Sequence, residues 1–129
     1  MTALIHSILK LSGELGTALR CSMEQIIYED KNIIVFHKPA GMLVQSDRSF
    51  DVDVVSCLMT YLAEKGEKPE IFVINRLDRP VSGLVLLAKN KKFAAALSGE
   101  LQNGAINKEY YAVICGSMPQ KKGMLTDYL

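Results

Sequence analysis

The feature that most constrains this chain is a polar segment, residues 75–83, enclosed by two short apolar runs at 71–74 and 84–88. Both runs have the length of a strand and are rich in β-branched or aliphatic side chains, as buried strands usually are. Pro80 restricts the backbone of the segment, and Gly83 permits a turn into the second run. The sequence therefore predicts a polar loop held between two buried strands.

A hairpin is predicted upstream of this loop. Residues 25–28 and 33–36 are short apolar runs separated by Glu-Asp-Lys-Asn, a composition typical of a tight turn. Lys38-Pro39-Ala40-Gly41 then ends the second strand, because proline lacks a backbone donor and glycine permits unusual dihedrals. We expect a shaped loop from there to about residue 50.

Two helices and one more strand complete the predicted fold. The first helix has Asp51 or Ser49 as a candidate N-cap and Gly66 beyond its end. Asn90 is the candidate cap of the second helix, which Asn103-Gly104 ends, and residues 108–115 follow as a strand. Apolar side chains at helical spacing define the two faces: Val55, Leu58, Met59 and Leu62, then Phe93, Leu97 and Leu101. The expected class is α+β, with a mixed, largely antiparallel sheet and flanking helices.

Composition indicates a soluble globular protein. Of the 129 residues 49% are hydrophobic, without the run of about 18 apolar residues that a membrane span requires. Cys21, Cys57 and Cys115 are odd in number and far apart, which fits neither a disulfide framework nor a zinc site and favours a cytoplasmic location. Residues 1–22 lack a convincing export signal. We interpret them as a leader before a natural start at Met23, and residues 23–129 as the domain.

The distribution of charge along the chain indicates more about function than the net charge does. The formal net charge is +1, which by itself does not support binding to nucleic acid. Between residues 76 and 108, however, six basic residues face two acids, Asp78 and Glu100. The basic residues are Arg76, Arg79, Lys89, Lys91, Lys92 and Lys108. This segment is predicted to face phosphates.

The polar loop places one carboxylate between two guanidinium groups, in the order Arg76-Leu77-Asp78-Arg79. Neighbouring positive charge favours the ionised form of an acid, so Asp78 is a candidate nucleophile or base. The alternative is a structural aspartate in a salt-bridged turn, which is common in proteins. The tetrapeptide alone does not decide between them.

A longer string resembles the signature of the RluA-type RNA pseudouridine synthases. It runs from Phe72 to Lys89 and reads FVINRLDRPVSGLVLLAK. Two further segments match in the right order: Lys38-Pro39-Ala40-Gly41 resembles the family's Lys-Pro-x-Gly loop, and Lys108-Glu109-Tyr110-Tyr111-Ala112 resembles its Lys-x-Tyr-x-Ala strand. The resemblance covers roughly residues 25–116.

The resemblance implies conversion of uridine to pseudouridine in ribosomal or transfer RNA, with Asp78 as the essential catalytic residue. The bond from ribose C1′ to base N1 must break and a bond from C1′ to C5 must form. A carboxylate either attacks the sugar or removes a proton from it, so the chemistry implies no metal and no other cofactor. A single acid near the reacting bond suffices, unlike in glycoside hydrolases.

The resemblance also implies how RNA is held. A stacked uridine must leave the helix to reach a pocket. Arg76 aligns with an arginine that fills the vacated space or grips the flipped nucleotide, and Tyr110 with a tyrosine that stacks on the target base. For Arg79 a salt bridge within the loop and a phosphate contact are equally open. Lys38 is interpreted as structural, and Tyr111 as core or surface.

The sequence departs from the family pattern in three places. Asn75 stands where histidine is common, and Pro80-Val81 replaces a pair that usually ends in threonine. After Leu129 the family's later strands and its Thr-Gly-Arg-x-His-Gln-Ile-Arg segment do not follow. We therefore expect an incomplete fold with little activity alone, which pairs with a missing C-terminal half or self-associates.

Two other functions compete with the enzyme. A non-catalytic RNA-binding module would bind RNA with strong salt dependence whether or not Asp78 is present. A small interaction domain without an RNA role would use the Arg-Leu-Asp-Arg loop as a structural ion-pair network, and would fail to bind RNA even at low salt.

Overall fold

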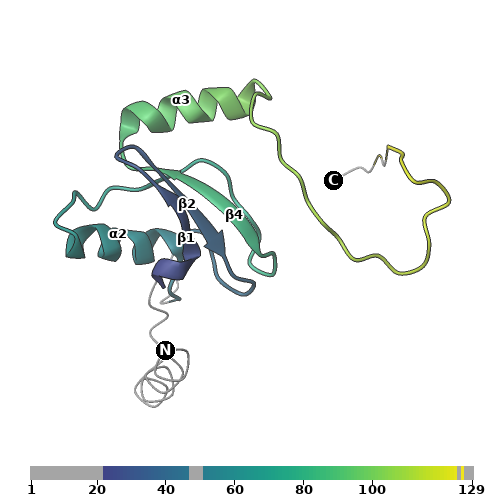
Figure 1. Ribbon diagram of the computed structural model, residues 1–129, viewed down its shortest axis with the longest axis horizontal. Coiled ribbons are helices and arrows are strands. Elements are labelled where there is room, and N and C mark those ends of the chain that lie inside the picture. Colours follow the sequence, from purple (N-terminus) through teal and green to yellow (C-terminus); the bar gives the residue numbers. More distant parts are fainter. Residues whose placement is uncertain (1–21, 47–50, 125, 127–129) are drawn as a thin grey trace, which may run out of the picture.

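The computed structural model describes residues 22–46, 51–124 and 126. Its centre is a four-stranded sheet in the order β1-β2-β4-β3, in which every neighbouring pair is antiparallel (Figure 1). The elements are a 3-10 turn η1 (Met23–Gln25), β1 (Ile26–Glu29), β2 (Ile33–Lys38), α2 (Val54–Glu64), β3 (Phe72–Val73), β4 (Gly83–Ala88) and α3 (Lys91–Gln102). The predicted α+β class, hairpin and two helices are confirmed. The one parallel pairing among the described residues is an isolated bridge between Leu43 and Asp53.

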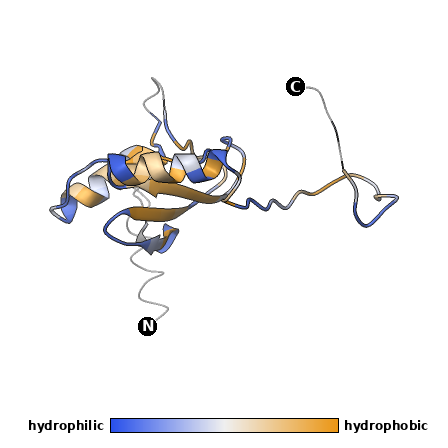
Figure 2. Ribbon diagram, turned by 90° about the horizontal axis from the view of Figure 1, so that it is seen from above, coloured by the Kyte–Doolittle hydropathy of each residue, from blue (hydrophilic) through white to orange (hydrophobic). Residues whose placement is uncertain are grey.

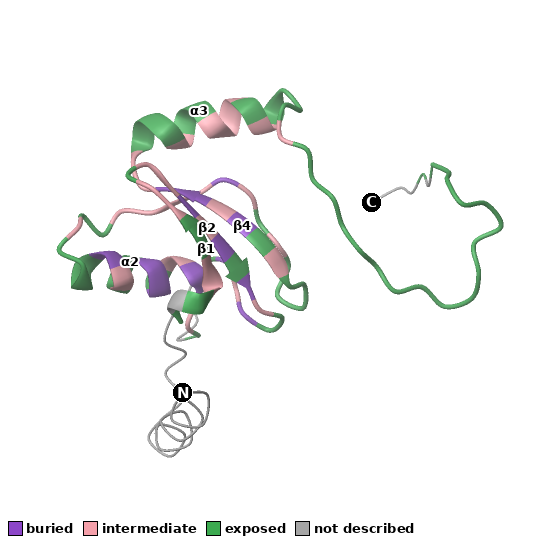
Figure 3. Ribbon diagram, in the orientation of Figure 1, coloured by how far each residue is buried: buried purple, intermediate pink, exposed green. Residues whose placement is uncertain are grey.

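The core lies between one face of the sheet and α2. Ile34 and Phe36 alternate inward along β2, Val85 and Leu87 do so along β4, and Leu58 of α2 packs against them. The strands are strongly apolar in Figure 2, and the buried positions in Figure 3 gather where α2 meets the sheet. Each fully buried side chain of this size contributes about 1.5–3 kcal/mol relative to an exposed one. α3 contributes no buried residue.

The helix caps follow the prediction at α3 but not at α2. The Asn90 side chain accepts the Phe93 N–H at 3.0 Å, as predicted. The N-cap of α2 is Asp53, because its carboxylate accepts the N–H groups of Ser56 at 2.7 Å and Ser46 at 2.8 Å. The prediction of Asp51 was therefore wrong, and the alternative, Ser49, lies outside the described residues, as do residues 1–21 of the predicted leader.

The predicted strand at 108–115 is not formed. These residues are extended but irregular, and the segment leaves the body of the molecule after α3 (Figures 1 and 3). Tyr111 and Val113 are fully exposed. A strand is stable only beside a hydrogen-bonded neighbour, and within residues 22–46 and 51–124 no strand pairs with this segment. In the described part of the chain, no helix is long and apolar enough to cross a membrane.

A ring of four alternating charges closes one end of the sheet. Glu29 pairs with Lys65 and Lys89, each at 2.9 Å, and Glu67 pairs with the same two lysines. The Tyr61 hydroxyl donates to Glu29 at 2.8 Å. The ring joins the end of β1 to the end of β4 and to the C-terminal end of α2. Because Lys89 is 8% exposed and doubly paired, it is not positioned to face phosphates, contrary to the prediction for this part of the basic segment.

Burial opposes ionisation of Glu29, but hydrogen bonds from Lys65, Lys89 and Tyr61 outweigh it and lower the pKa of Glu29 to about 2. Burial by itself would lower the pKa of Lys89. Hydrogen bonds to Glu67 and Glu29, and their negative charge, outweigh this effect and raise the pKa. Both shifts stabilise the charged forms in the folded protein.

A second polar anchor is Lys38, whose side chain is completely buried at the end of β2. Its ammonium group donates to the carbonyl oxygens of Met42 at 2.8 Å, Pro39 at 3.1 Å and Arg79 at 3.2 Å. A buried ammonium is tolerated only when its donors are satisfied, and three carbonyls match its three N–H groups. Lys38 is therefore structural, as the sequence suggested.

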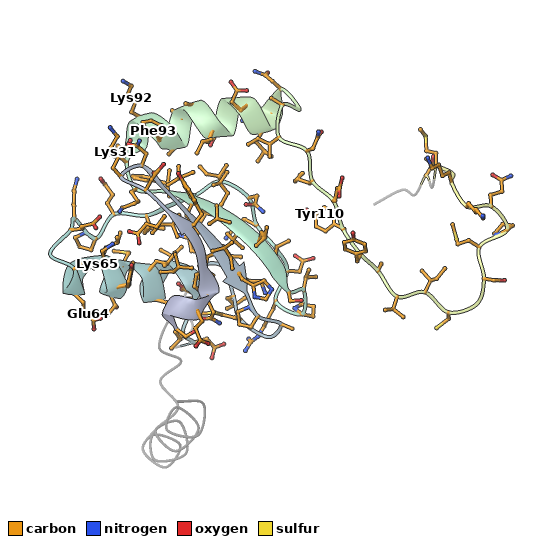
Figure 4. All side chains as sticks on the ribbon, in the orientation of Figure 1. Lys31, Glu64, Lys65, Lys92, Phe93 and Tyr110 are labelled. Atoms are coloured by element: carbon orange, nitrogen blue, oxygen red, sulfur yellow. The ribbon has the colours of Figure 1, made fainter. Side chains whose placement is uncertain are left out.

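We predict that Glu29→Gln lowers the free energy of unfolding at pH 7 by about 1–2 kcal/mol. The folded-state pKa of Glu29 lies below the ordinary value of 4.5, so its contribution is present above about pH 4.5 and is lost as the pH falls toward 2. In urea unfolding measured from pH 7 to pH 2, the free energy of unfolding should fall less steeply with decreasing pH in the variant than in the parent. Glu64→Gln is the matched control, because Glu64 is exposed on the side of α2 away from the sheet (Figure 4); an equal effect there would contradict the prediction.

We predict that Lys38→Met lowers the free energy of unfolding by about 2–4 kcal/mol, because it removes all three hydrogen bonds of the buried ammonium, including the one to the Met42 carbonyl. Thermal and urea unfolding followed by circular dichroism measure the loss. Lys91→Met, at an exposed position, makes the same chemical change and should stay within about 0.5 kcal/mol of the parent. A loss below about 1 kcal/mol for Lys38→Met would show that the anchor is dispensable.

Candidate active site

The loop between β3 and β4 carries Asp78, and its base is closed by a side chain. Asn75 accepts the Leu86 N–H at 2.7 Å and donates to the Leu84 carbonyl at 3.2 Å. The Ile74 N–H donates to the Leu86 carbonyl at 3.0 Å. The Asn75 amide thus continues the pairing of β3 with β4 beyond the two residues of the strand itself. The predicted anchoring of this loop by the sheet is confirmed.

The tip of the loop is a turn that begins at Asp78. The Val81 N–H donates to the Asp78 carbonyl at 3.0 Å, while Leu77 packs against the core. Gly83 has φ +149, and a Cβ there would lie 3.3 Å from the Leu77 Cδ1 atom, so a side chain at this position would be strained. With Leu77 held inward, the side chain of Asp78 on the next residue is exposed to solvent.

The backbone after Asp78 is held by the loop that follows β2. The Arg79 carbonyl accepts both the Gly41 N–H at 2.7 Å and the Lys38 ammonium at 3.2 Å. Gly41 has φ +88, a conformation that favours glycine. Two segments about 40 residues apart in the chain are therefore joined directly beside the Asp78 carboxylate.

Arg79 reinforces the same junction through its side chain. Its Nε donates to the Gly41 carbonyl at 3.0 Å, and its Nη1 pairs with the Asp51 carboxylate at 3.0 Å. The sequence left open a salt bridge within the loop or a phosphate contact. The ion pair is real, but its partner, Asp51, lies outside the loop.

Lys38 is a cation whose charge interacts with the Asp78 carboxylate. Burial lowers the pKa of Lys38, and the Asp78 carboxylate raises it in part again. Arg79, which was expected to place positive charge beside Asp78, is instead paired with Asp51, and a third cation, Lys38, interacts with Asp78. No local pattern predicts this interaction, since Lys38 lies 40 residues before Asp78.

Two hollows flank the loop. The larger, about 590 Å³, lies over the sheet face opposite α2 and is lined by Val35, Leu86, Leu101, Val81 and Tyr110 among others. The smaller, about 350 Å³, lies between Gly41, Asp51 and Arg79. Neither is lined by Asp78 or Arg76, although Leu77 and Ser82 of the same loop line the larger one.

The predicted site residues are therefore only partly brought together. Tyr110 lies on the extended segment after α3 and is 63% exposed (Figure 4), and it reaches the larger hollow beside the Asp78 loop. Tyr111 lines the same hollow. Arg76 is exposed on the loop itself. Within the described residues, no group of three His, Cys, Asp or Glu side chains is placed to hold a metal ion.

Two residues that contribute to the site were not singled out for this role from the sequence. Asp51 was considered only as a helix cap, and nothing in the spacing of residues 51 and 79 predicts their ion pair. Asn75 was noted as a departure from the family pattern. Its position directly after an apolar run is a signal that an amide side chain could extend a strand pairing.

Comparison with known proteins identifies what this loop resembles. Residues 32–129 match the family model described as RNA pseudouridylate synthase. A dual-specificity RNA pseudouridine synthase RluA from Vibrio parahaemolyticus is 37% identical over 98 residues, which are 76% of this chain and 38% of the relative. A ribosomal large subunit pseudouridine synthase C from Rickettsia bellii is 34% identical over 111 residues, covering 86% of this chain and 36% of the relative.

A tRNA pseudouridine synthase C from Pectobacterium carotovorum is 34% identical over 97 residues, covering 75% of this chain and 25% of the relative. The chain thus spans about a quarter to two fifths of the length of the curated relatives that it matches. Among solved structures, human RNA pseudouridylate synthase domain containing 4 superposes with a TM-score of 0.51 at 24% identity, covering 62% of this chain and 30% of that one, which supports the fold.

The family model covers more than half of the chain and includes both Lys38 and the Asp78 loop. The antiparallel sheet with its two helices agrees with that assignment. This chain belongs to the RNA pseudouridylate synthase family, within its RluA-type branch.

Proposed function

We propose that this chain takes part in converting uridine to pseudouridine within RNA, with Asp78 as the catalytic residue. One observation carries the proposal: Asp78 is an exposed carboxylate at the tip of a loop that is fixed at its base by Asn75 and beside its tip by Gly41 and Lys38. A reacting group that is both accessible and held in place is what catalysis requires.

The chemistry needs one carboxylate at the sugar. To begin the reaction, Asp78 either attacks ribose C1′, displacing N1 of the uracil, or removes a proton from the sugar. The detached uracil then turns so that its C5 bonds to C1′. In the first route this displaces the Asp78 carboxylate from C1′, and in the second the sugar regains its proton. In both routes C5 then loses its proton and N1 gains one. Lys38 is buried and Asp78 is exposed, so a nucleotide could approach the carboxylate from solvent without displacing the lysine.

Two side chains are proposed to hold the RNA, and a third to act indirectly. The target uridine must leave its stack, because Asp78 cannot reach it within a helix. Arg76, exposed two residues before Asp78, is proposed to fill the vacated space or grip the flipped nucleotide, and Tyr110 to stack on the base. Tyr110 already lines the hollow beside the loop. Arg79 was expected to contact the substrate; we propose that it acts through the loop instead, since its guanidinium is engaged with Gly41 and Asp51.

The substrate class follows from the relatives. Their names specify transfer RNA, ribosomal RNA of the large subunit, or dual specificity. We propose ribosomal or transfer RNA as the substrate here, and a cytoplasmic location in keeping with the cysteine pattern.

We also propose that turnover requires a further protein surface, supplied by a C-terminal half or by a second copy of the chain. Leu84 on the open sheet face and Tyr111, Val113 and Ile114 on the irregular segment are exposed apolar side chains that such a surface would cover. A neighbouring strand would also give residues 108–115 the pairing that they lack in this structure.

We predict that Asp78→Asn abolishes pseudouridine formation, lowering it at least about 10³-fold, because the amide neither attacks nor accepts a proton. Pseudouridine-specific chemical mapping of bulk transfer and ribosomal RNA measures the product, with the chain alone and with a family-like C-terminal half attached. Glu109→Gln removes an exposed acid near Tyr110 and is the matched control.

The alternative function, a non-catalytic RNA-binding module, predicts different results for the same variants. Activity that is lost in Asp78→Asn and kept in Glu109→Gln supports the enzyme. If the extended parent protein binds RNA with strong salt dependence but forms no pseudouridine, the binding module replaces the enzyme. If the short chain is as active as the extended one, the proposal of a required further surface is wrong.

A further inference from the structure

The interaction that no family resemblance assigned is the contact between Arg79 and Asp51. The two residues are 28 positions apart, and their side chains approach to 3.0 Å at the rim of the smaller hollow. Both side chains remain about half exposed, at 55% and 49%. An exposed ion pair of this kind contributes only about 0.2–1 kcal/mol to stability, so stability alone does not account for its placement.

The contacts of Arg79 indicate a role for the ion pair other than stability. Arg79 follows Asp78 directly, and it is engaged at three points: its carbonyl by Gly41 and Lys38, its Nε by the Gly41 carbonyl, and its Nη1 by Asp51. The carbonyl and Nε contacts with Gly41 form a reciprocal pair, at 2.7 and 3.0 Å. Among the described residues, Asp51 is the side chain that pairs with this guanidinium.

We propose that Asp51 and Arg79 are positioning residues: their ion pair locks Arg79 onto Gly41 and thereby fixes the direction in which the Asp78 carboxylate points. This inference rests on the proposed role of Asp78. A displacement of about 1 Å at a reacting group costs up to about 10²-fold in rate, so a weak surface ion pair has a large effect when it sets an angle at the catalytic residue.

The competing role for Arg79 is direct contact with an RNA phosphate. In that case Asp51 would be a competitor of the phosphate, and removing its charge would free the guanidinium for RNA. The two roles therefore predict opposite results for Asp51→Asn. A positioning pair loses turnover with KM unchanged, whereas a phosphate contact gains affinity with turnover unchanged.

The first measurement is amide hydrogen exchange by NMR on the full chain, which needs no activity. The Gly41 and Val81 amides donate to the Arg79 and Asp78 carbonyls and report on the loop directly. In Asp51→Asn we expect their exchange to accelerate about two- to fivefold, with amides of the β2 and β4 ladder unchanged. Asp51→Glu keeps the charge and should restore protection. Glu70→Gln breaks another exposed ion pair, Lys68–Glu70, and should leave both amides unchanged.

The second measurement is single-turnover and steady-state pseudouridine formation with the chain carrying the family-like C-terminal half. We expect Asp51→Asn to lower kcat about three- to tenfold with KM within twofold of the parent. Unchanged exchange at Gly41 and Val81 in Asp51→Asn overturns the inference, and so does a lower KM with unchanged kcat. The exchange result stands whether or not Asp78→Asn abolishes activity, so failure of the proposed function is distinguishable from failure of the positioning role.

Discussion

The site depends on one buried cation. The Lys38 ammonium lies at the end of β2 and binds carbonyl oxygens from its own loop and from Arg79, which comes 41 residues later. Burying an ammonium is costly in free energy unless every N–H finds an acceptor, so its presence forces two loops to keep their carbonyls converged on one point. The Asp78 loop is one of these two loops. The core supplies most of the stability of the fold, whereas this cation determines where the Asp78 loop lies relative to the core.

The sequence was most informative where side-chain periodicity and local capping decide the structure. The hairpin and the Asn90 cap of α3 follow from short-range patterns and were confirmed. The predicted face of α2 was confirmed at Leu58 and Leu62, whereas Val55 is only partly buried and Met59 is exposed. The cap of α2 was misassigned by two residues because Asp51 and Asp53 are equally good caps in a sequence; Asp53 is chosen because Ser46 also donates to it. The strand predicted at 108–115 was wrong for another reason, since a strand requires a partner and a single sequence does not specify whether one is in place.

The site was predicted in its residues more than in its contacts. Asp78 was identified from the loop that carries it, and the resemblance of the longer string supplied its expected role. The partners of Arg79 could not be predicted, because Gly41 and Asp51 lie 38 and 28 residues away and only the folded chain brings them together. For Lys89, the predicted environment was wrong. It was counted with the exposed basic residues from its position in the chain, but the end of the sheet places it between Glu29 and Glu67.

The restraint on the Asp78 loop is made largely by main-chain atoms of the loop after β2. Carbonyl oxygens of Pro39, Gly41 and Met42, together with the Gly41 N–H, supply four hydrogen bonds at this junction, two to the Lys38 ammonium and two to Arg79. Main-chain groups are the same for every amino acid, so Ala40 can be exchanged for larger residues without altering this geometry. Position 41 has far less freedom because of its positive φ. Sequence drift in this loop should therefore leave the geometry of the Asp78 loop intact as long as the lysine, the glycine and the arginine are kept.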